Sequence, residues 1–509
     1  MPYILSLDAG TTSVRAIIFD HEGQICASVQ EEIRQIYPHP GWVEHDPEEI
    51  WQTQISVAVS ALEQARIWPA DIAGVGIANQ RETIIVWDRD TGKPIYNAIV
   101  WQDRRTATVC DRLREGGHEG AVQGLTGLVI DPYFSATKIQ WILDHVPGAH
   151  SQAVDGRIIC GTVETWLIWK MTGGKLHITE PSNASRTMLF NLSAGEWDQD
   201  LLKLFGIPRC MMPEVRSSSE IYGEISSVPL LSSILLAGAA GDQQAALLGE
   251  MCLRPGLAKN TYGTGCFLLQ NIGSKPVISS QRLITTATCK IGSNQEFALE
   301  GSVFIGGAVI QWLRDGLHLV QSAQEVDALA SSVSNSGGVI LVPAFTGLGA
   351  PHWDPYARGM MIGLTRDTTT AHIARAAIEG IALQVADLID AMHADTGQQL
   401  QELRVDGGAS RSEPLLQFQA DLLGIPVVRP SVIETTALGA AYLAGIAVGF
   451  WSNIDSIATH WRVDKTFNPM MQRGRVAEIR ERWSEALGRA KNWEPHSPSE
   501  CTNHPIKPT

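Results

Sequence analysis

The sequence is poor in positive charge and contains no run of lysine and arginine. Its 509 residues include 39 Lys and Arg against 54 Asp and Glu, giving a formal net charge of −15. Nucleic acids and anionic membranes bind proteins through clustered cations, so neither is predicted as a partner. A phosphate site in this chain must therefore be built locally, from backbone donors, a metal ion and a few placed cations.

Cysteine and long apolar runs are also scarce. The eight cysteines are scattered singly, without a Cys-x-x-Cys pair, which predicts reduced thiols in the cytoplasm. No basic leader precedes the first apolar segment, so no signal peptide is predicted. The longest apolar run, 437–451, is too short and too rich in Gly and Ala to cross a bilayer, and we expect a buried helix there without membrane insertion.

The length exceeds the size at which single hydrophobic cores stop growing, so at least two domains are expected. Apolar residues make up 44% and charged residues 18%, as in ordinary globular proteins. Strands that alternate with helices in the first half indicate an α/β fold. We predict domains at 1–250 and 251–491, followed by a disordered tail at 492–509 that is rich in Pro, Ser, His and Lys.

The segment 4–20 reads as a strand, a polar turn and a second strand. Its tip, Asp8-Ala9-Gly10-Thr11-Thr12-Ser13, combines small residues with three hydroxyl groups, a composition that suits an anion site. Asp8 would repel phosphate unless it holds a cation, most simply Mg²⁺ with its waters. The alternative is an ordinary polar hairpin.

A second segment, 257–271, repeats this plan around Gly263-Thr264-Gly265. Two such hairpins suggest a duplicated architecture in which each half contributes one phosphate-facing turn. Further elements are predicted from caps, β-branched runs and helical spacing: a helix after Asp46-Pro47, strands at 72–78, 234–240, 403–406 and 425–429, and helices from 245 and over 372–392 and 415–423.

Polar clusters follow these strands. Asn79-Gln80-Arg81-Glu82-Thr83 and Gly241-Asp242-Gln243-Gln244 each come directly after a buried strand, and Trp101-Gln102-Asp103-Arg104-Arg105 ends another. Strand ends are where α/β folds place their sites. Together with 261–267 and the Gly347–Trp353 motif, these clusters resemble the FGGY carbohydrate kinases, which share the ATPase core of actin and the 70-kDa heat-shock proteins. The resemblance runs from about residue 3 to residue 450.

The resemblance implies two actin-like, ribonuclease H-like ATPase domains, each with a mixed sheet and flanking helices, with the active-site cleft between them. It also implies phosphoryl transfer from ATP, and the motifs are most similar to members that phosphorylate glycerol. Homodimers and homotetramers are usual in the family. For the substrate site it implies hydroxyl-binding Arg81, Glu82, Tyr133, Asp242 and Gln243, with Trp101 and Phe267 as apolar walls. Such a set is chemically reasonable, because unpaired hydroxyl groups in a dry cleft are costly and aromatic rings cover CH faces.

Asp242 is the expected general base, since a carboxylate within hydrogen-bond reach can orient an alcohol and accept its proton. For ATP the resemblance implies that Thr11, Thr12, Ser13 and Thr264 hold phosphates, Arg15 balances charge and Asp8 anchors Mg²⁺. It further implies that Gly307, Gln311, Gly408 and Ala409 line the nucleotide site. Ser412 stands where the family often has an adenine-contacting Asn, so altered purine discrimination is expected.

Two other functions stay open. A related kinase for a pentulose or a four-carbon polyol would share Asp242 and the phosphate turns, but would differ around Arg81, Glu82 and Trp101. A chaperone-like ATPase would need no polyol cluster. Simpler structural roles are also available: Asp242 as a helix cap, Arg81 and Glu82 as a surface ion pair, and the aromatic residues as core.

Some family members bind fructose 1,6-bisphosphate through a loop rich in Gly, Lys and Arg. The corresponding segment here, 225–236, contains no cation. We therefore predict that fructose 1,6-bisphosphate leaves the turnover of the purified protein unchanged. Inhibition by this compound in a steady-state assay would contradict the prediction.

Overall fold

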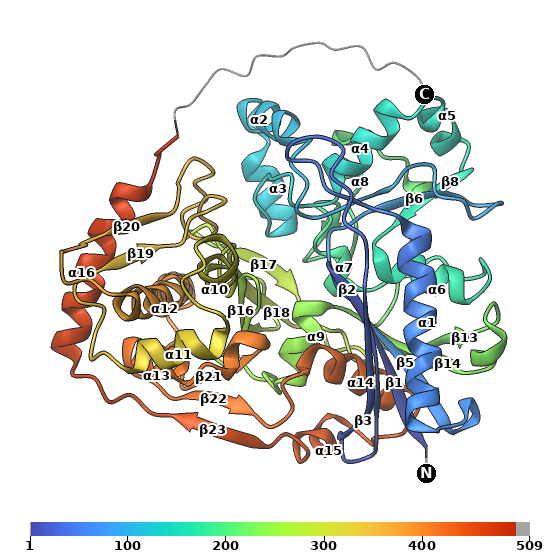
Figure 1. Cartoon of the computed structure of the whole chain (residues 1–509). Helices are drawn as coiled ribbons and strands as arrows, with labels where there is room; N and C mark the ends of the chain where they lie inside the picture. The colour runs from blue at the N-terminus through green and yellow to red at the C-terminus, as the bar shows by residue number, and fades with distance from the viewer. Residues whose placement is uncertain (1, 495–509) are drawn as a thin grey trace.

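Two large mixed β-sheets form the framework of the computed structural model, which describes residues 2–494 (Figure 1). The first has six strands in the order β13-β14-β5-β1-β2-β3, and the second has seven in the order β17-β18-β16-β15-β21-β22-β23. The first sheet comprises β1 (Tyr3–Ala9), β2 (Ser13–Phe19), β3 (Ile25–Glu32), β5 (Ile72–Asn79), β13 (Ser219–Glu224) and β14 (Leu235–Gly241). The second comprises β15 (Ala258–Tyr262), β16 (Cys266–Gly273), β17 (Ile284–Ala287), β18 (Phe297–Val303), β21 (Leu403–Asp406), β22 (Val427–Pro430) and β23 (Val463–Phe467).

The duplication predicted from the two hairpins is confirmed. In the first sheet β1 and β2 are antiparallel, β5 and β14 run parallel to β1, and β13 is antiparallel to β14. In the second sheet β15 and β16 are antiparallel, β21 and β22 run parallel to β15, and β23 is antiparallel to β22. Outer strands β3 and β18 take corresponding places, so only β17 lies outside the repeat.

Helix starts follow local capping chemistry. Helix α1 (Pro47–Ala65) begins after Asp46, whose carboxylate accepts a hydrogen bond from the Glu48 N–H, as predicted. Helices α12 (Thr370–Thr396) and α13 (Glu413–Leu423) lie where helical spacing predicted them. Helix α9 (Asp242–Gly249) begins at Asp242 rather than at Ala245, with Gly241 as its N-cap and without a side-chain cap. Asp242 is therefore the first residue of the helix and does not cap it.

Helix α14 (Thr435–Ala447) belongs to the second half of the chain but packs on the first sheet, where Figure 1 shows it in orange beside the blue strands β1 and β5. The approach to the sheet is very close, because a Cβ on Gly76 would lie 2.0 Å from the Ala440 carbonyl oxygen. Helix α14 packs as closely on α9, where a Cβ on Gly439 would lie 1.8 Å from the Ala245 carbonyl oxygen. Helix α1 contacts β1, β2 and β3 and shares a hydrophobic cluster with Leu5, whereas Ile4 packs with α14, so the two helices cover opposite faces of the sheet.

A long segment between β5 and β13 carries further helices: α2 (Ala107–Glu115), α3 (Glu119–Thr126), α4 (Ala136–His145), α5 (Ala149–Val154) and α6 (Val163–Met171). The hydrophobic core around α4 is continuous with that of the second sheet. Within residues 2–494, no helix combines the length and hydropathy needed to span a bilayer. Most of the predicted disordered tail, from residue 495 onward, lies outside the described residues.

Candidate active site

The register of the first sheet brings the predicted polar clusters together. Asp8 is opposite Ala78, and Asn79 is opposite both Ala9 and Gly241. The carboxyl ends of β1, β5 and β14 therefore meet at one edge of the sheet. The tip of the first hairpin, the cluster after Asn79 and the start of α9 all leave from this edge.

Asp242 lies beside Arg81 at this edge, with 3.3 Å between its Oδ1 and the Arg81 Nε. Its carboxylate also accepts a hydrogen bond from the Gln243 N–H at 2.7 Å, and 29% of its side chain remains exposed. Burial raises the pKa of Asp242, while Arg81 and Lys259 oppose that rise. A Cβ on Gly241 would lie 2.6 Å from the Arg81 Cδ, so glycine is needed for this approach. The site thus presents one accessible carboxylate that is a better proton acceptor than an ordinary surface Asp.

Four charged residues form a buried network around Arg81. The guanidinium of Arg81 donates to both carboxylate oxygens of Glu300, at 2.6 and 2.8 Å. Arg186 donates to Glu82 at 2.6 Å and to Glu300 at 3.1 Å. All four side chains are almost fully buried, so Arg81 and Glu82 are not a surface ion pair. Burial alone would raise the pKa of Glu300, but Arg186 and Arg81 lower it to about 2.

Glu300 and Arg186 were not predicted from the sequence. Glu300 lies in β18, within the apolar run Phe-Ala-Leu-Glu-Gly, and a lone charge in a buried strand was the available signal. Arg186 lies in a segment that the sequence indicates only as a loop. Both residues position Arg81 and Glu82.

The three predicted aromatic residues lie together beside the first hairpin turn. The Trp101 ring centroid lies 5.5 Å from that of Tyr133 and 6.3 Å from that of Phe267. The Trp101 Nε1–H donates to the Thr11 Oγ1 at 2.9 Å. Phe267 is the second residue of β16, just after the second hairpin turn. Trp101 therefore contacts the first turn at Thr11 and lies beside the strand that leaves the second turn.

Lys259 is a further residue that sequence reasoning missed. This fully buried side chain on β15 donates to the Gln243 Oε1 and, at 2.7 Å, to the Thr261 Oγ1. It fixes the orientation of the Gln243 amide and, through its charge, opposes the raised pKa of Asp242. A single lysine in a predicted strand is a weak sequence signal, because most such lysines face solvent.

Glutamine side chains hold the first hairpin turn in shape. The amide of Gln80 donates to the Gly10 carbonyl oxygen, that of Gln35 to the Thr11 carbonyl oxygen, and that of Gln30 to the Ser13 hydroxyl oxygen, each at 2.9 Å. Thr12 at the apex remains exposed. A turn fixed in this way can present its N–H and O–H groups to an anion at little ordering cost.

The second turn lies against the residues expected at the nucleotide. The Gly306 N–H donates to the Thr264 carbonyl oxygen at 2.7 Å, and the Gly307 N–H to that of Gly263 at 2.8 Å. A Cβ on Gly307 would lie 3.8 Å from the Ala409 Cβ, so these two residues are neighbours. Gln311 ends the short helix α10 (Ala308–Gln311) and is exposed.

The two adjacent glycines after β21, Gly407 and Gly408, have different roles. Gly407 has φ +82°, and a Cβ there would lie 2.6 Å from the Tyr262 carbonyl oxygen, so only glycine fits the turn. A Cβ on Gly408 would meet nothing within 4 Å. The open space beside Gly408 suits the flat face of a base or sugar.

Two of the residues predicted to contact ATP already have partners within the protein. Arg15 forms an ion pair with Glu434. The Ser412 hydroxyl donates to the Asp327 Oδ1 at 2.6 Å, on α11 (Ala323–Ser331), and accepts the Leu415 N–H as the cap of α13. Ser412 therefore has a structural role in addition to its predicted place at the nucleotide.

Asp8 has the surroundings expected of a cation ligand. Burial raises its pKa to about 7, with Arg15 opposing the rise and Asp242 adding to it. Within residues 2–494, no protein hydrogen bond or ion pair reaches its carboxylate. Clusters of three or more His, Cys, Asp or Glu residues able to hold a metal are absent from the same residues. A single unpartnered carboxylate fits Mg²⁺, which keeps several waters and takes other ligands from phosphates.

A duplicated mixed sheet, a glycine- and threonine-containing turn in each half and an accessible carboxylate at the edge of the first sheet are the arrangement expected of an ATP-dependent sugar or polyol kinase. The chain belongs to the FGGY family of carbohydrate kinases, whose N-terminal domain model matches residues 3–249 and whose C-terminal domain model matches residues 258–448.

Curated relatives carry a more specific name. The chain is 62% identical over 494 residues to a glycerol kinase of Koribacter versatilis, covering 97% of this chain and 99% of the relative. It is 57% identical over 493 residues to a glycerol kinase of Trichlorobacter lovleyi, covering 97% and 99%. The crystal structure of Plasmodium falciparum glycerol kinase with ADP is similar at a TM-score of 0.90 and 35% identity, covering 96% of this chain and 98% of that one.

Proposed function

We propose that this chain catalyses the ATP-dependent phosphorylation of glycerol to sn-glycerol 3-phosphate, with Asp242 as general base. The observation that carries the assignment is the accessible Asp242 carboxylate, which lies 3.3 Å from the Arg81 Nε at the sheet edge from which the first hairpin turn also leaves. The glycerol kinases of Koribacter versatilis and Plasmodium falciparum, similar over nearly the whole chain, support this choice of substrate.

In this reaction Asp242 accepts the proton of the attacking glycerol hydroxyl. The hydroxyl oxygen forms a bond to the γ-phosphorus, the bond to the β,γ-bridging oxygen breaks, and ADP leaves. Arg81, Glu82, Gln243 and Tyr133 hold the hydroxyl groups, while Trp101 and Phe267 cover the carbon chain. The buried network holds Arg81 and Glu82 in place before substrate binds, so little reorganisation is needed.

The two hairpin turns hold the triphosphate. Thr11, Thr12, Ser13 and Thr264 provide N–H and O–H donors, and Arg15 balances charge that develops on the phosphoryl group. The adenosine lies along Gly307, Gln311, Gly408, Ala409 and Ser412. Because the Ser412 hydroxyl already donates to Asp327, discrimination among purines by this residue is weak.

Asp8 would hold Mg²⁺ through the waters of the ion, and the phosphates of ATP would supply further ligands. When bound, the ion neutralises phosphate charge and aligns the γ-phosphoryl group for transfer. The support for this role is the unpartnered Asp8 carboxylate with its raised pKa. A cytoplasmic location and a homodimer or homotetramer are further predictions from the family.

Replacing Asp8 with asparagine is expected to raise the Mg²⁺ concentration needed for half-maximal turnover by at least about ten-fold, because one anionic ligand is lost. Mg²⁺ titrations at fixed ATP and glycerol measure the change. Asp90→Asn, which neutralises an exposed acid in a turn, serves as the control. Equal Mg²⁺ requirements in both variants would refute the assignment of Asp8.

A panel of acceptors tests the function directly. ADP release is followed with Mg²⁺-ATP and glycerol, dihydroxyacetone, erythritol, xylulose or no acceptor. Strong turnover with glycerol supports the proposal. Preference for xylulose or erythritol would establish a kinase of the same family for a larger substrate and would overturn the roles of Arg81, Glu82 and Trp101. A rate of ATP hydrolysis that is the same with every acceptor and without one would instead indicate a chaperone-like ATPase.

A further inference from the structure

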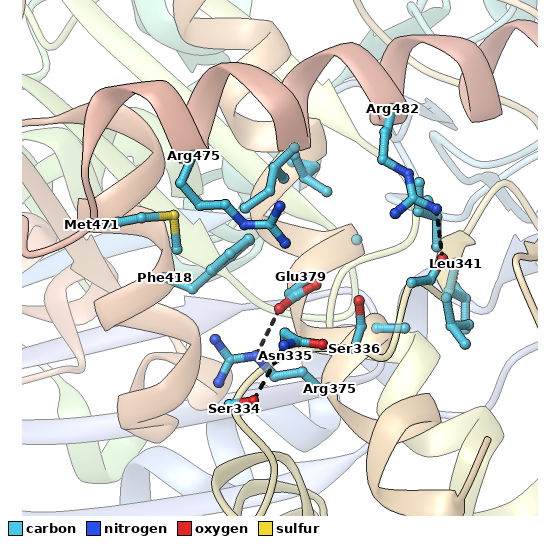
Figure 2. A pocket seen from close by; sticks show the side chains of 17 residues that line it. Ser334, Asn335, Ser336, Leu341, Arg375, Glu379, Phe418, Met471, Arg475 and Arg482 are labelled. Carbon is cyan, nitrogen blue, oxygen red and sulfur yellow. Dashed lines mark hydrogen bonds and ion pairs between the residues drawn. The ribbon is translucent and has the colours of Figure 1, made fainter. Parts of the chain in front are cut away.

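A pocket of about 220 Å³ is lined by residues other than those of the candidate active site (Figure 2). It is enclosed by α12, α13, α16 (Arg473–Ala490) and the segment 334–341, which leads into β19 (Ile340–Val342). None of the predicted substrate or nucleotide residues lines it. Its volume is sufficient for a molecule somewhat larger than a phosphate ion.

Three arginines line this pocket: Arg375, Arg475 and Arg482. Glu379 is the one carboxylate among the lining residues, and the Arg375 Nε donates to it at 2.8 Å. Figure 2 shows Arg375 and Arg475 on opposite sides of Glu379. In a chain with a formal net charge of −15, this local excess of positive charge is unusual.

The arginines keep free hydrogen-bonding capacity. A guanidinium has five N–H donors. Arg475 uses one nitrogen on Glu478 at 2.7 Å, and Arg482 uses one on the Gly338 carbonyl oxygen at 3.0 Å. Within residues 2–494, the Nη1 and Nη2 of Arg375 have no hydrogen-bond partner. Several donors at the pocket are therefore available to a ligand.

The rest of the lining is apolar. Phe418 of α13, Met471, Ile479 of α16 and Leu341 form a wall beside the arginines, and the Arg375 guanidinium lies 5.6 Å from the Phe418 ring centroid. A ligand that fills this pocket needs an anionic head for the arginines and an apolar body for the wall. Inorganic anions satisfy only the first requirement.

We propose that this pocket binds a small phosphate monoester with an apolar body, at a site separate from the two phosphate turns. Arg375 and Arg475 already pair with Glu379 and Glu478, so the ligand is chosen by the free donors rather than by net charge. A phosphate monoester offers three acceptor oxygens to these donors, whereas a carboxylate offers two. Each planar guanidinium group can donate two parallel hydrogen bonds to two phosphate oxygens, a geometry that a lysine ammonium group could not provide.

Phenyl phosphate is the probe, titrated calorimetrically into the full chain with saturating Mg²⁺-ADP and glycerol so that the active site is occupied. The expected result is saturable binding with a Kd of about 1 mM or tighter. Arg475→Gln with Arg482→Gln should weaken binding at least about ten-fold, because charge-assisted hydrogen bonds are lost. Turnover with glycerol should not change.

Arg489→Gln with Lys491→Gln is the matched control, since it removes the same charge from the end of the same helix without touching the pocket. This control should bind phenyl phosphate like the parent chain. Absence of saturable binding, or equal binding by the Arg475 and Arg482 variant, would overturn the proposal. If inorganic phosphate bound as tightly as phenyl phosphate, the apolar wall would make no contribution to binding, contrary to the proposal. If benzyl alcohol bound as tightly, the phosphate group would make no contribution, and the proposal would also be overturned.

Discussion

Replacement of Asp242 by asparagine is expected to lower kcat for glycerol phosphorylation by about 10²–10⁴-fold, the usual contribution of a general base. Asparagine keeps the shape of the side chain and its place at the start of α9, but it cannot accept the hydroxyl proton. Because the Gln243 N–H and Arg81 contacts are made to an oxygen that asparagine retains, binding of glycerol should change much less. Steady-state ADP release and calorimetric glycerol binding measure the two effects separately.

Asp200→Asn provides the control, since Asp200 is an exposed acid near the start of α8 (Gln199–Leu204). It should leave both kcat and glycerol binding unchanged. If Asp242→Asn turned over glycerol at the parent rate, another group would have to accept the proton. If it lost glycerol binding and turnover equally, Asp242 would be a binding residue only.

Glu300→Gln should have the largest effect on stability. It removes one of the two carboxylates that face Arg81 and Arg186, and leaves an uncompensated positive charge in a buried site. Breaking such a buried pair costs about 3–5 kcal/mol of the free energy of unfolding. In protein that remains folded, Arg81 loses its bidentate partner, and the KM for glycerol should rise by at least about ten-fold.

The contribution of Glu300 also depends on pH. Its folded-state pKa of about 2 lies below the ordinary 4.5, so its stabilising effect is complete above pH 4.5 and is lost as the pH falls toward 2. The stability difference between the parent chain and Glu300→Gln, measured by urea unfolding, should therefore shrink in acid. Glu413→Gln, at an exposed ion pair with Lys465, should cost less than about 1 kcal/mol at any pH. Equal losses in the two variants would contradict the role of the buried network.

Local chemistry was sufficient to predict the elements that carry the site. The polar turns between β-branched runs located both hairpins, and their repetition predicted the duplicated sheet. The cap at Asp46 and the helical spacing of 372–392 predicted α1 and α12. The site residues Arg81, Glu82 and Asp242 came from the resemblance of the motifs after the strands to those of the FGGY kinases, and the structure brings them to one edge of the first sheet.

What the sequence could not reveal depends on contacts between distant segments. Glu300 is paired with Arg81 across the two halves of the chain, and no local pattern connects them. Lys259 faces Gln243 for the same reason. The start of α9 was placed too late because the Gly241 cap provides no side-chain signal. Periodicity reports which face of an element is buried, but not which buried charges meet.

The position of α14 has a consequence for synthesis of the protein on the ribosome. Strands β1, β5 and β14 are all made by residue 241, but the helix that covers one face of them begins only at Thr435. At a translation rate of about 5–20 residues per second, that face of the sheet remains uncovered for roughly 10–40 s. The glycines that allow the close approach of α14, such as Gly76, also leave that face with little side-chain surface until α14 is synthesised. The nascent first half is therefore a sheet with one face finished and the other still awaiting a segment made near the end of translation.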